Sequence, residues 1–472
     1  MPKAPTLAVA AALALGTVLA HAAEPAPVAA APPSAAPAVR LEIPVDAYRL
    51  PNGLRVVLSR DTSVPTVTVA MYYHIGFRIE PRNRTGFAHL FEHLMFQETT
   101  NLGKGEADRL VSGNGGVSNG STRFDYTNFY EVVPSHVLEP VLWVEAERMR
   151  GLALSETSLQ NQKDVVKNEV RVNVLNRPYG GFSWLDLPQA ANQNWFNAHN
   201  FYGDFADIDG ATLADVRSFY DTYYVPSNAV LVVAGDFEPA AARGQIERYF
   251  GPLPTRPAPA GVDVSEPPQQ KERAAQVTDA RAPRPAIAFG YHVPPRNTPQ
   301  WYAFGLIDEI LLQGEDSRLW QRLVKERGYS DSIEGGINLV GNMFDYEGPM
   351  LWSAYLVHDP ASDPRAITRD FDAVVARLQR EPVPAAELER ALTKIRSALY
   401  DVAGSSNRFG LVDLLASFTL FDDDPGRVNR IEAEFRKVTP ELIQQTARQY
   451  LARSNRTRVT LRPGHGAKES TP

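Results

Sequence analysis

The chain has 472 residues, 44% apolar and 22% charged, which is enough to build the cores of two or three globular domains. Its formal net charge of −7 argues against nucleic acid as the main partner, because no basic excess exists to neutralise phosphates. The absence of cysteine excludes disulfides, thiolate metal sites and a cysteine nucleophile, so any metal must be held by imidazole and oxygen ligands.

The N-terminus has the pattern of a secretory signal peptide. Lys3 precedes an apolar run from Leu7 to Leu19, and Ala20-His-Ala22 matches a small-x-small cleavage site. The run is short for a membrane span, although an uncleaved anchor is the alternative. We therefore expect residues 1–22 to be a signal peptide for export to the periplasm or the exterior. We expect residues 23–39 to form an extended Ala/Pro-rich leader, and the mature chain to contain no membrane span.

Strand-like and helix-like stretches alternate up to about residue 252, which favours a mixed α and β fold. The expected strands are 54–59, 65–74, a pair within 118–133 that is broken near Phe124, and the continuously apolar 228–234. The expected helices are 85–96, 135–152 and 155–175, with a turn at 113–116. Ser135 and Ser155 open the last two helices and are expected to cap free backbone N–H groups.

Residues 253–275 are polar and rich in proline, which is typical of a linker. We predict two domains on either side of them, an N-terminal domain at 40–252 and a C-terminal domain at 276–465, with a tail at 466–472. The expected fold class is α+β, with two tandem homologous domains.

A repeated strand-then-helix unit supports this interpretation. Val69–Ile75 aligns with Ile287–Val293, and Phe87–Met95 aligns with Phe304–Leu312. Chance similarity between two ordinary α/β units is the alternative. The aligned helices differ in one respect: the first carries two histidines, whereas the second has only apolar residues at those positions (His89 and His93 against Leu306 and Ile310). A metal site is therefore expected in the first domain only.

The motif His89-x-x-Glu92-His93 carries the predicted chemistry. Residues four apart on a helix share a face, so the two imidazoles can bind one metal ion. Glu92 can then reach a water on that metal without binding the metal itself. The flanking residues are apolar, which makes the alternative of two surface histidines on an exposed helix weak. Burying three ionisable groups without compensation would cost several kcal/mol, and a bound cation removes that cost.

A tetrahedral catalytic zinc needs a third protein ligand and an open position for water. Glu169, in the expected helix 155–175, is the candidate, although an isolated helical Glu is usually a solvated surface residue.

At this point the sequence resembles the M16 peptidases, the family of pitrilysin, insulin-degrading enzyme and the mitochondrial processing peptidase. Their inverted zinc motif is His-x-x-Glu-His. The resemblance covers nearly the whole chain after the leader and rests on residues 86–96, 165–169, 223–236 and 317–319. It implies the M16/LuxS-like metallohydrolase fold. It also implies one Zn²⁺ per chain, bound by His89, His93 and Glu169.

The resemblance further implies a zinc-dependent endopeptidase of oligopeptides or unfolded segments. The zinc-bound water, whose pKa the ion lowers towards about 7, would be activated by Glu92 as general base. In the family a substrate peptide adds to a sheet edge as an extra strand, which maps onto the strand around Asn119. An ordinary hairpin strand is the alternative interpretation there.

Two positions depart from the family pattern. A second Glu usually stands seven residues before the ligand Glu, and this chain has Gln162 there, an uncharged group that could still hydrogen-bond around the metal ligands. The family's Arg and Tyr of the inactive half fall on Val324 and Asp331 when aligned without gaps. Arg322 and Tyr329 have the same spacing but lie two residues out of frame, so we favour absence of the pair.

Absence of that pair would suggest a second, related subunit without the zinc motif, or a homodimer. Two functions from different classes remain open. The chain is either a zinc endopeptidase or a non-catalytic scaffold or peptide-binding subunit on the same fold. The intact set of His89, Glu92, His93 and Glu169 favours the enzyme.

Overall fold

The computed structural model describes residues 42–464. The predicted signal peptide, leader and tail lie outside the described residues. In this described part, no helix combines the length and the hydrophobicity that crossing a bilayer requires.

The first half of the chain forms a six-stranded sheet in the order β1-β2-β6-β3-β5-β4. Its strands are β1 (Asp46–Arg49), β2 (Arg55–Arg60), β3 (Thr66–Tyr73), β4 (Val117–Thr122), β5 (Thr127–Pro134) and β6 (Ala229–Gly235). β2 and β6 are parallel, and all other neighbours are antiparallel. The continuously apolar β6 is buried along its whole length, as expected for a central strand. The polar β4 lies at an edge, where one row of its backbone groups has no strand partner.

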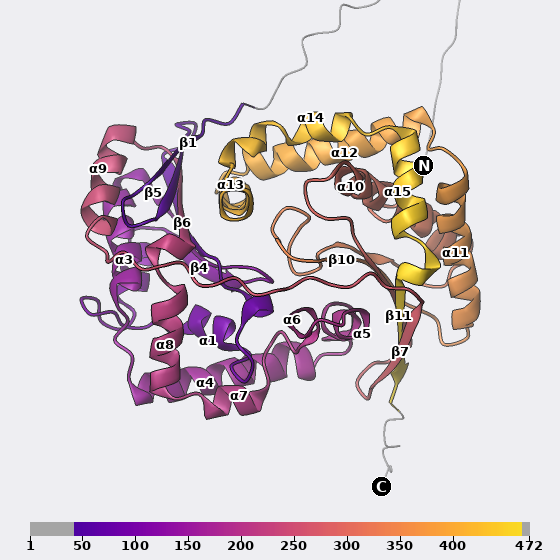
Figure 1. Cartoon of the computed structure of the whole chain (residues 1–472), viewed down its shortest axis with the longest axis horizontal. Helices are drawn as coiled ribbons and strands as arrows, with labels where there is room; N and C mark the ends of the chain where they lie inside the picture. Colours follow the sequence, from indigo (N-terminus) through magenta and orange to yellow (C-terminus); the bar gives the residue numbers. More distant parts are fainter. Residues whose placement is uncertain (1–41, 465–472) are drawn as a thin grey trace, which may run out of the picture. The chain divides into compact units, whose positions relative to one another are not determined.

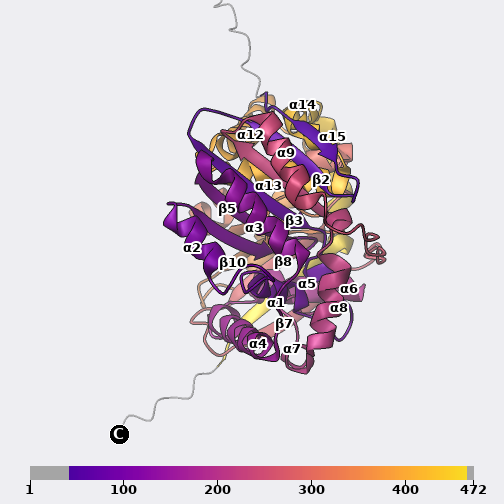
Figure 2. The same cartoon turned by 90° about the vertical axis from the view of Figure 1, so that its left-hand side faces the viewer.

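Side chains alternate between two separate cores on the two faces of this sheet. Val69 and Met71 pack with the helices of the first half, whereas Ala70 and Tyr72 belong to a core that includes α13 (Phe409–Asp422) of the second half. Figure 1 shows α3 and α9 on one side of the sheet and α13 on the other, and Figure 2 looks onto the side of α3 and α9. The helices of the first half are α1 (Phe87–Leu94), α2 (Glu106–Gly113), α3 (Leu138–Arg150), α4 (Glu156–Val170), α5 (Leu187–Ala191), α6 (Trp195–Ala198), α7 (Phe205–Gly210), α8 (Leu213–Tyr223) and α9 (Pro239–Phe250).

The second half repeats this plan with a five-stranded sheet in the order β7-β11-β8-β10-β9. Its strands are β7 (Arg273–Asp279), β8 (Ala286–His292), β9 (Glu334–Ile337), β10 (Leu351–Val357) and β11 (Arg456–Pro463). The order and the directions match β2-β6-β3-β5-β4, with one parallel pair followed by three antiparallel pairs. The other helices are α10 (Pro299–Leu311), α11 (Pro364–Arg380), α12 (Ala385–Gly404), α14 (Ile431–Arg436) and α15 (Pro440–Tyr450).

An asparagine with the same pair of hydrogen bonds occurs in both domains. The Asn228 side-chain amide donates to the backbone oxygens of His74 and Tyr223, at 3.1 and 2.9 Å. Asn455 makes the corresponding bonds to His292 and Tyr450, at 2.9 and 2.7 Å. The predicted pair of related domains is therefore present, down to equivalent hydrogen bonds. β7 begins at Arg273, so the last residues of the segment expected to be a linker form a strand instead.

The two predicted serine caps have different outcomes. Ser155 caps α4 in a reciprocal capping box with Ser158, as expected. The prediction for Ser135 is wrong. A short 3-10 turn (Ser135–Val137) precedes α3, so Ser135 lies too far from the first free N–H groups of the helix. Its hydroxyl donates instead to Asp236 at 3.2 Å.

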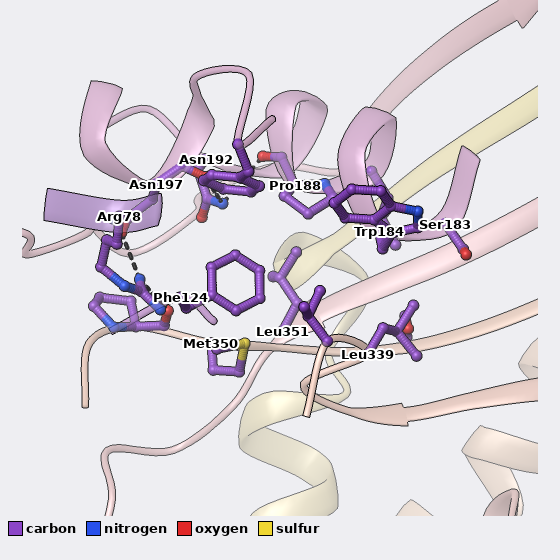
Figure 3. Close-up of a pocket in the computed structure, with 15 residues that line it drawn as sticks. Arg78, Phe124, Ser183, Trp184, Pro188, Asn192, Asn197, Leu339, Met350 and Leu351 are labelled. Carbon is purple, nitrogen blue, oxygen red and sulfur yellow. Dashed lines mark hydrogen bonds between the residues drawn. The ribbon is translucent and has the colours of Figure 1, made fainter. Parts of the chain in front are cut away.

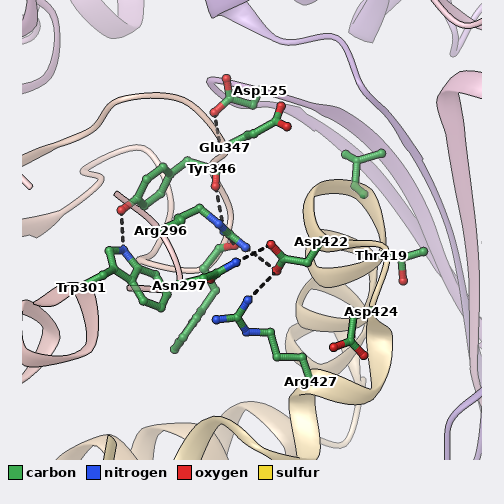
Figure 4. A network of polar contacts seen from close by, with 12 residues as sticks. Asp125, Arg296, Asn297, Trp301, Tyr346, Glu347, Thr419, Asp422, Asp424 and Arg427 are labelled. Atoms are coloured by element: carbon green, nitrogen blue, oxygen red, sulfur yellow. Dashed lines mark hydrogen bonds and ion pairs between the residues drawn. The ribbon is translucent and has the colours of Figure 1, made fainter. Parts of the chain in front are cut away.

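Two equivalent arginines, one from each domain, hold the loop between β9 and β10. Arg78 donates to Asp125 at 2.6 Å and to the backbone oxygen of Pro349 at 2.7 Å. Arg296 donates to the backbone oxygen of Tyr346 at 2.8 Å and to Asp422 at 2.7 Å (Figure 4). Asp125 in turn accepts the N–H of Glu347 at 2.8 Å. The loop of the second domain is thus bonded from both sides.

Candidate metal centre

α1 presents two histidines to one point. The helix is buried on nearly all sides by Phe87, Leu90, Phe91 and Leu94, which fixes its rotation against the sheet. The Nε2 atoms of His89 and His93 face one another at 3.4 Å. The His89 side chain is only 6% exposed, whereas that of His93 is 21% exposed.

Glu169, in the last turn of α4, completes the cluster. Its Oε2 lies 3.2 Å from Nε2 of His93 and 3.9 Å from Nε2 of His89. Within residues 42–464 this is the one group of three His, Asp or Glu side chains whose ligand atoms converge. Ligands about 2.0–2.1 Å from a tetrahedral zinc lie about 3.3 Å from one another, so this spacing fits such an ion.

The electrostatics of the cluster also suit a cation. Burial lowers the pKa of His89 below its ordinary value, although Glu92 and Glu169 act in the opposite direction. The hydrogen bond from His93 is the main cause that lowers the pKa of Glu169, and the charges of both histidines add to it. The neutral imidazole and ionised carboxylate that result are the forms that bind metal.

Glu92 lies beside the cluster and is held separately. Oγ1 of Thr122, the last residue of β4, donates to Oε2 of Glu92 at 2.7 Å. The carboxylate is therefore fixed by the edge strand rather than by the three converging ligands. Sequence reasoning missed Thr122 as a partner, because the two residues are 30 apart and only the packing of α1 against β4 brings them together.

A cavity of about 430 Å³ adjoins this arrangement. It is lined by Phe77, Thr122, Arg123, Trp184 and Tyr202 of the first domain and by Leu339, Val340 and Gly341 of the second. The Tyr202 ring lies 5.6 Å from that of His89. Thr122 and Tyr202 thus connect the cavity to Glu92 and to the candidate ligand His89. The local sequence around Arg123 and Tyr202 contains no motif that would have identified them.

A smaller hollow next to this cavity belongs to the contact between the domains (Figure 3). It shares Trp184, Leu339 and Val340 with the cavity and reaches Arg78 and Asn197. Its free volume of about 30 Å³ suffices for one or two waters but not for a substrate side chain.

The remaining predicted residues lie outside the cluster. Asn119 is exposed on the edge strand β4, and its side-chain oxygen accepts the N–H of Gly120 at 2.8 Å. Gln162 is buried on α4, seven residues before Glu169.

The residues considered for the family's Arg and Tyr lie in the second domain. Arg322 and Tyr329 both donate to the carboxylate of Asp370, at 3.0 and 2.7 Å. Val324 packs against the core, and the exposed Asp331 pairs with Arg284. The hydrogen bonds that these residues form with other side chains all stay within the second domain.

Several known proteins are similar to this chain in sequence or fold. Residues 55–178 match the sequence model for "Insulinase (Peptidase family M16)", and residues 210–395 match that for "Peptidase M16 inactive domain". "Zinc protease PqqE" of Helicobacter pylori is 27% identical over 429 residues, covering 89% of this chain and 93% of that protein. A solved structure of a protease from Helicobacter pylori has a TM-score of 0.82 at 25% identity, over 89% of this chain and 100% of that one. Human cytochrome b-c1 complex subunit 1, mitochondrial, is 25% identical over 205 residues, 43% of this chain and 42% of that protein.

Proposed function

Because the chain belongs to peptidase family M16, we propose that it is a zinc-dependent endopeptidase that hydrolyses oligopeptides or unfolded segments. The observation that carries this proposal is the convergence of His89, His93 and Glu169 within 4.8 Å, with Glu92 fixed beside them. A scaffold has no need for this convergence of ionisable groups around the buried imidazole of His89.

In this proposal each residue has a separate task. A zinc ion held by the three ligands would supply Lewis acidity and lower the pKa of a water beside it to about 7. Thr122 occupies one oxygen of Glu92, which leaves the other to accept the proton of the attacking water. Glu92 then delivers that proton to the amine of the leaving peptide.

The edge strand gives this chemistry a substrate path. An extended peptide can pair with the free edge of β4 near Asn119, and the strand ends at Thr122, the partner of Glu92. Peptide bound there would run towards the cavity that Arg123 and Tyr202 line, where both side chains can donate hydrogen bonds to substrate carbonyls.

Metal removal tests the proposal directly. The purified chain is expected to contain one equivalent of zinc, measured by mass spectrometry, and to cleave a fluorogenic oligopeptide. Chelation should abolish cleavage, and one equivalent of Zn²⁺ should restore it. A protein that binds no zinc would refute the enzyme hypothesis, and a tightly folded protein offered as substrate should remain uncut.

Tyr202→Phe is expected to lower kcat by about tenfold to a hundredfold with little change in KM or zinc affinity. The reason is that the variant loses one donor to the developing oxyanion but keeps the ring beside His89. Steady-state kinetics on the same peptide measure this. Tyr249→Phe is the control, because it removes a hydroxyl bonded to Glu139 away from the site. Equal kinetics for Tyr202→Phe and wild type would exclude this role.

A non-catalytic subunit is the second candidate, since cytochrome b-c1 complex subunit 1 is a relative over part of the chain. The enzyme could also need a second M16-like subunit without the zinc motif, or a second copy of itself, because Val324 and Asp331 stand at the family's Arg and Tyr positions in the ungapped alignment, and Arg322 and Tyr329 lie two residues out of frame. Full activity of the isolated monomer, shown by rates proportional to protein concentration, would argue against both arrangements.

We also propose an exported, periplasmic location, which rests on the pattern of residues 1–22 and the absence of cysteine.

A further inference from the structure

We infer that Glu80 is a positioning residue for the metal centre, whose buried carboxylate fixes the first turn of α1 and thereby the place of His89. The inference rests on the proposed function, because it assigns a role towards the same metal. Nothing in the sequence motif indicates it, since Glu80 lies outside His-x-x-Glu-His.

Both carboxylate oxygens of Glu80 accept hydrogen bonds at the N-terminus of α1, the helix that carries His89 and His93. Oε2 accepts the N–H of Gly86 at 2.8 Å, and Oε1 accepts the N–H of Ala88 at 2.6 Å. The first N–H groups of any helix lack partners within the helix itself. Glu80 is 0% exposed, so these bonds are shielded from water.

The helix cannot supply this cap from its own first residue. Gly86, at the N-cap position, has φ of 84° and makes no side-chain cap bond. It also packs directly against Gly203. A Cβ added at Gly203 would lie 2.5 Å from the Cα and N atoms of Gly86. A Ser, Thr or Asp at Gly86 would be strained by that φ and would crowd this contact, so the acceptor has to come from another part of the chain.

The equivalent helix of the second domain is capped without a buried carboxylate. α10, which carries no histidine, is capped by the neutral hydroxyl of Thr298, which accepts the N–H of Trp301 at 3.2 Å. At α1 the structure instead keeps a carboxylate whose burial raises its pKa to about 8. His199, whose Nε2 lies 3.9 Å from Glu80, does not offset this charge, because burial lowers the pKa of His199 and favours its neutral imidazole. The cap with the larger desolvation penalty is therefore the one on the helix that carries the proposed metal ligands.

The position of His89 explains why this cap matters. His89 follows Ala88, whose N–H Glu80 holds, whereas His93 lies one turn further along the helix. Fraying of the first turn would therefore move His89 and leave His93 in place. The 3.4 Å between their Nε2 atoms depends on that turn.

Zinc affinity and amide exchange test the inference on the full chain. Glu80→Ala is expected to weaken zinc binding about tenfold to a hundredfold, the usual effect of removing a partner around metal ligands. Its α1 amides should exchange about tenfold faster in the metal-free protein, measured by hydrogen exchange with mass spectrometry. Glu80→Gln keeps one acceptor oxygen and the side-chain shape, so intermediate effects are expected even if the alanine variant folds poorly.

Thr298→Ala is the matched control, because it removes the cap of the corresponding helix that lacks ligands. It should lower the melting temperature but leave zinc affinity within about twofold of wild type. Equal zinc affinity for Glu80→Gln, Glu80→Ala and wild type would overturn the inference, as would an equal loss in Thr298→Ala. If the wild-type chain binds no zinc, the proposed function fails, and unchanged α1 exchange in the Glu80 variants would then refute the cap as well.

Discussion

Glu92→Gln is expected to reduce kcat for peptide hydrolysis by about a thousandfold while zinc remains bound at wild-type affinity. Glutamine can still accept the bond from Thr122, but its amide cannot take a proton from water. A thousandfold corresponds to about 4 kcal/mol of transition-state stabilisation. Glu92 is not among the three converging ligand side chains, so metal content should not change. Single-turnover kinetics and metal analysis on the same preparations measure both quantities.

The second domain offers a matched control for this substitution. Glu309 occupies the position of Glu92 in the aligned helix α10, in the domain without the histidines. Glu309→Gln makes the same chemical change, carboxyl to amide, in the equivalent helix and is expected to leave kcat unchanged. Wild-type turnover by Glu92→Gln would refute the general-base mechanism. A comparable loss in Glu309→Gln would show that the effect comes from the fold rather than from proton transfer.

Arg148→Met is expected to be the most destabilising of the substitutions considered, by about 3–5 kcal/mol, because it breaks a buried ion pair and leaves charge unpaired. The Arg148 guanidinium on α3 bonds Glu131 of β5 at 2.7 Å and also bonds Glu145. All three side chains are at most 2% exposed. Arg150→Met is the control. Arg150 is 40% exposed, and its partner Glu147, although buried, keeps a hydrogen bond from Asn101, so a smaller loss than that of Arg148→Met is expected.

The loss of unfolding free energy caused by Arg148→Met should depend on pH. Burial and the neighbouring Glu145 already raise the pKa of Glu131 in the folded protein, and Arg148 counteracts this. Without Arg148 the folded state binds protons more tightly than the unfolded state, so stability falls as pH rises. Urea unfolding at pH 5.5 and pH 8 should show the larger deficit at pH 8. A deficit that is equal at both values, or larger at pH 5.5, would contradict this account.

The sequence predicts the fold well where one local pattern determines the structure. The unbroken apolar run at β6 and the capping box at Ser155 are of this kind. Ser135 was predicted wrongly because its neighbours form a 3-10 turn that its own residue type does not reveal. The aligned segments around His74 and His292 predicted the duplication, since equivalent strands keep similar residues even where function has diverged.

The residues of the candidate site also differ in whether a local sequence pattern predicts them. His89, Glu92 and His93 stand on one helix, so their spacing alone predicts a common face. Glu169 needed the family resemblance, because an isolated helical Glu carries no signal. Thr122 and Tyr202 could not be predicted, since each reaches α1 through packing between segments distant in sequence. Glu80 lies only six residues before Gly86, but no local motif indicates that its carboxylate caps α1.

The doubly bonded loop between β9 and β10 has a consequence for how the chain can be divided. Arg78 and Arg296 belong to opposite halves of the duplication, yet both bind carbonyl groups of the same loop. A fragment ending before β7 would leave the buried Arg78 without the carbonyl of Pro349, and the other fragment would lose Asp125. The duplication has therefore produced two copies that are no longer self-sufficient. The peptide link between them acts as a tether that keeps each copy at high effective concentration for the other.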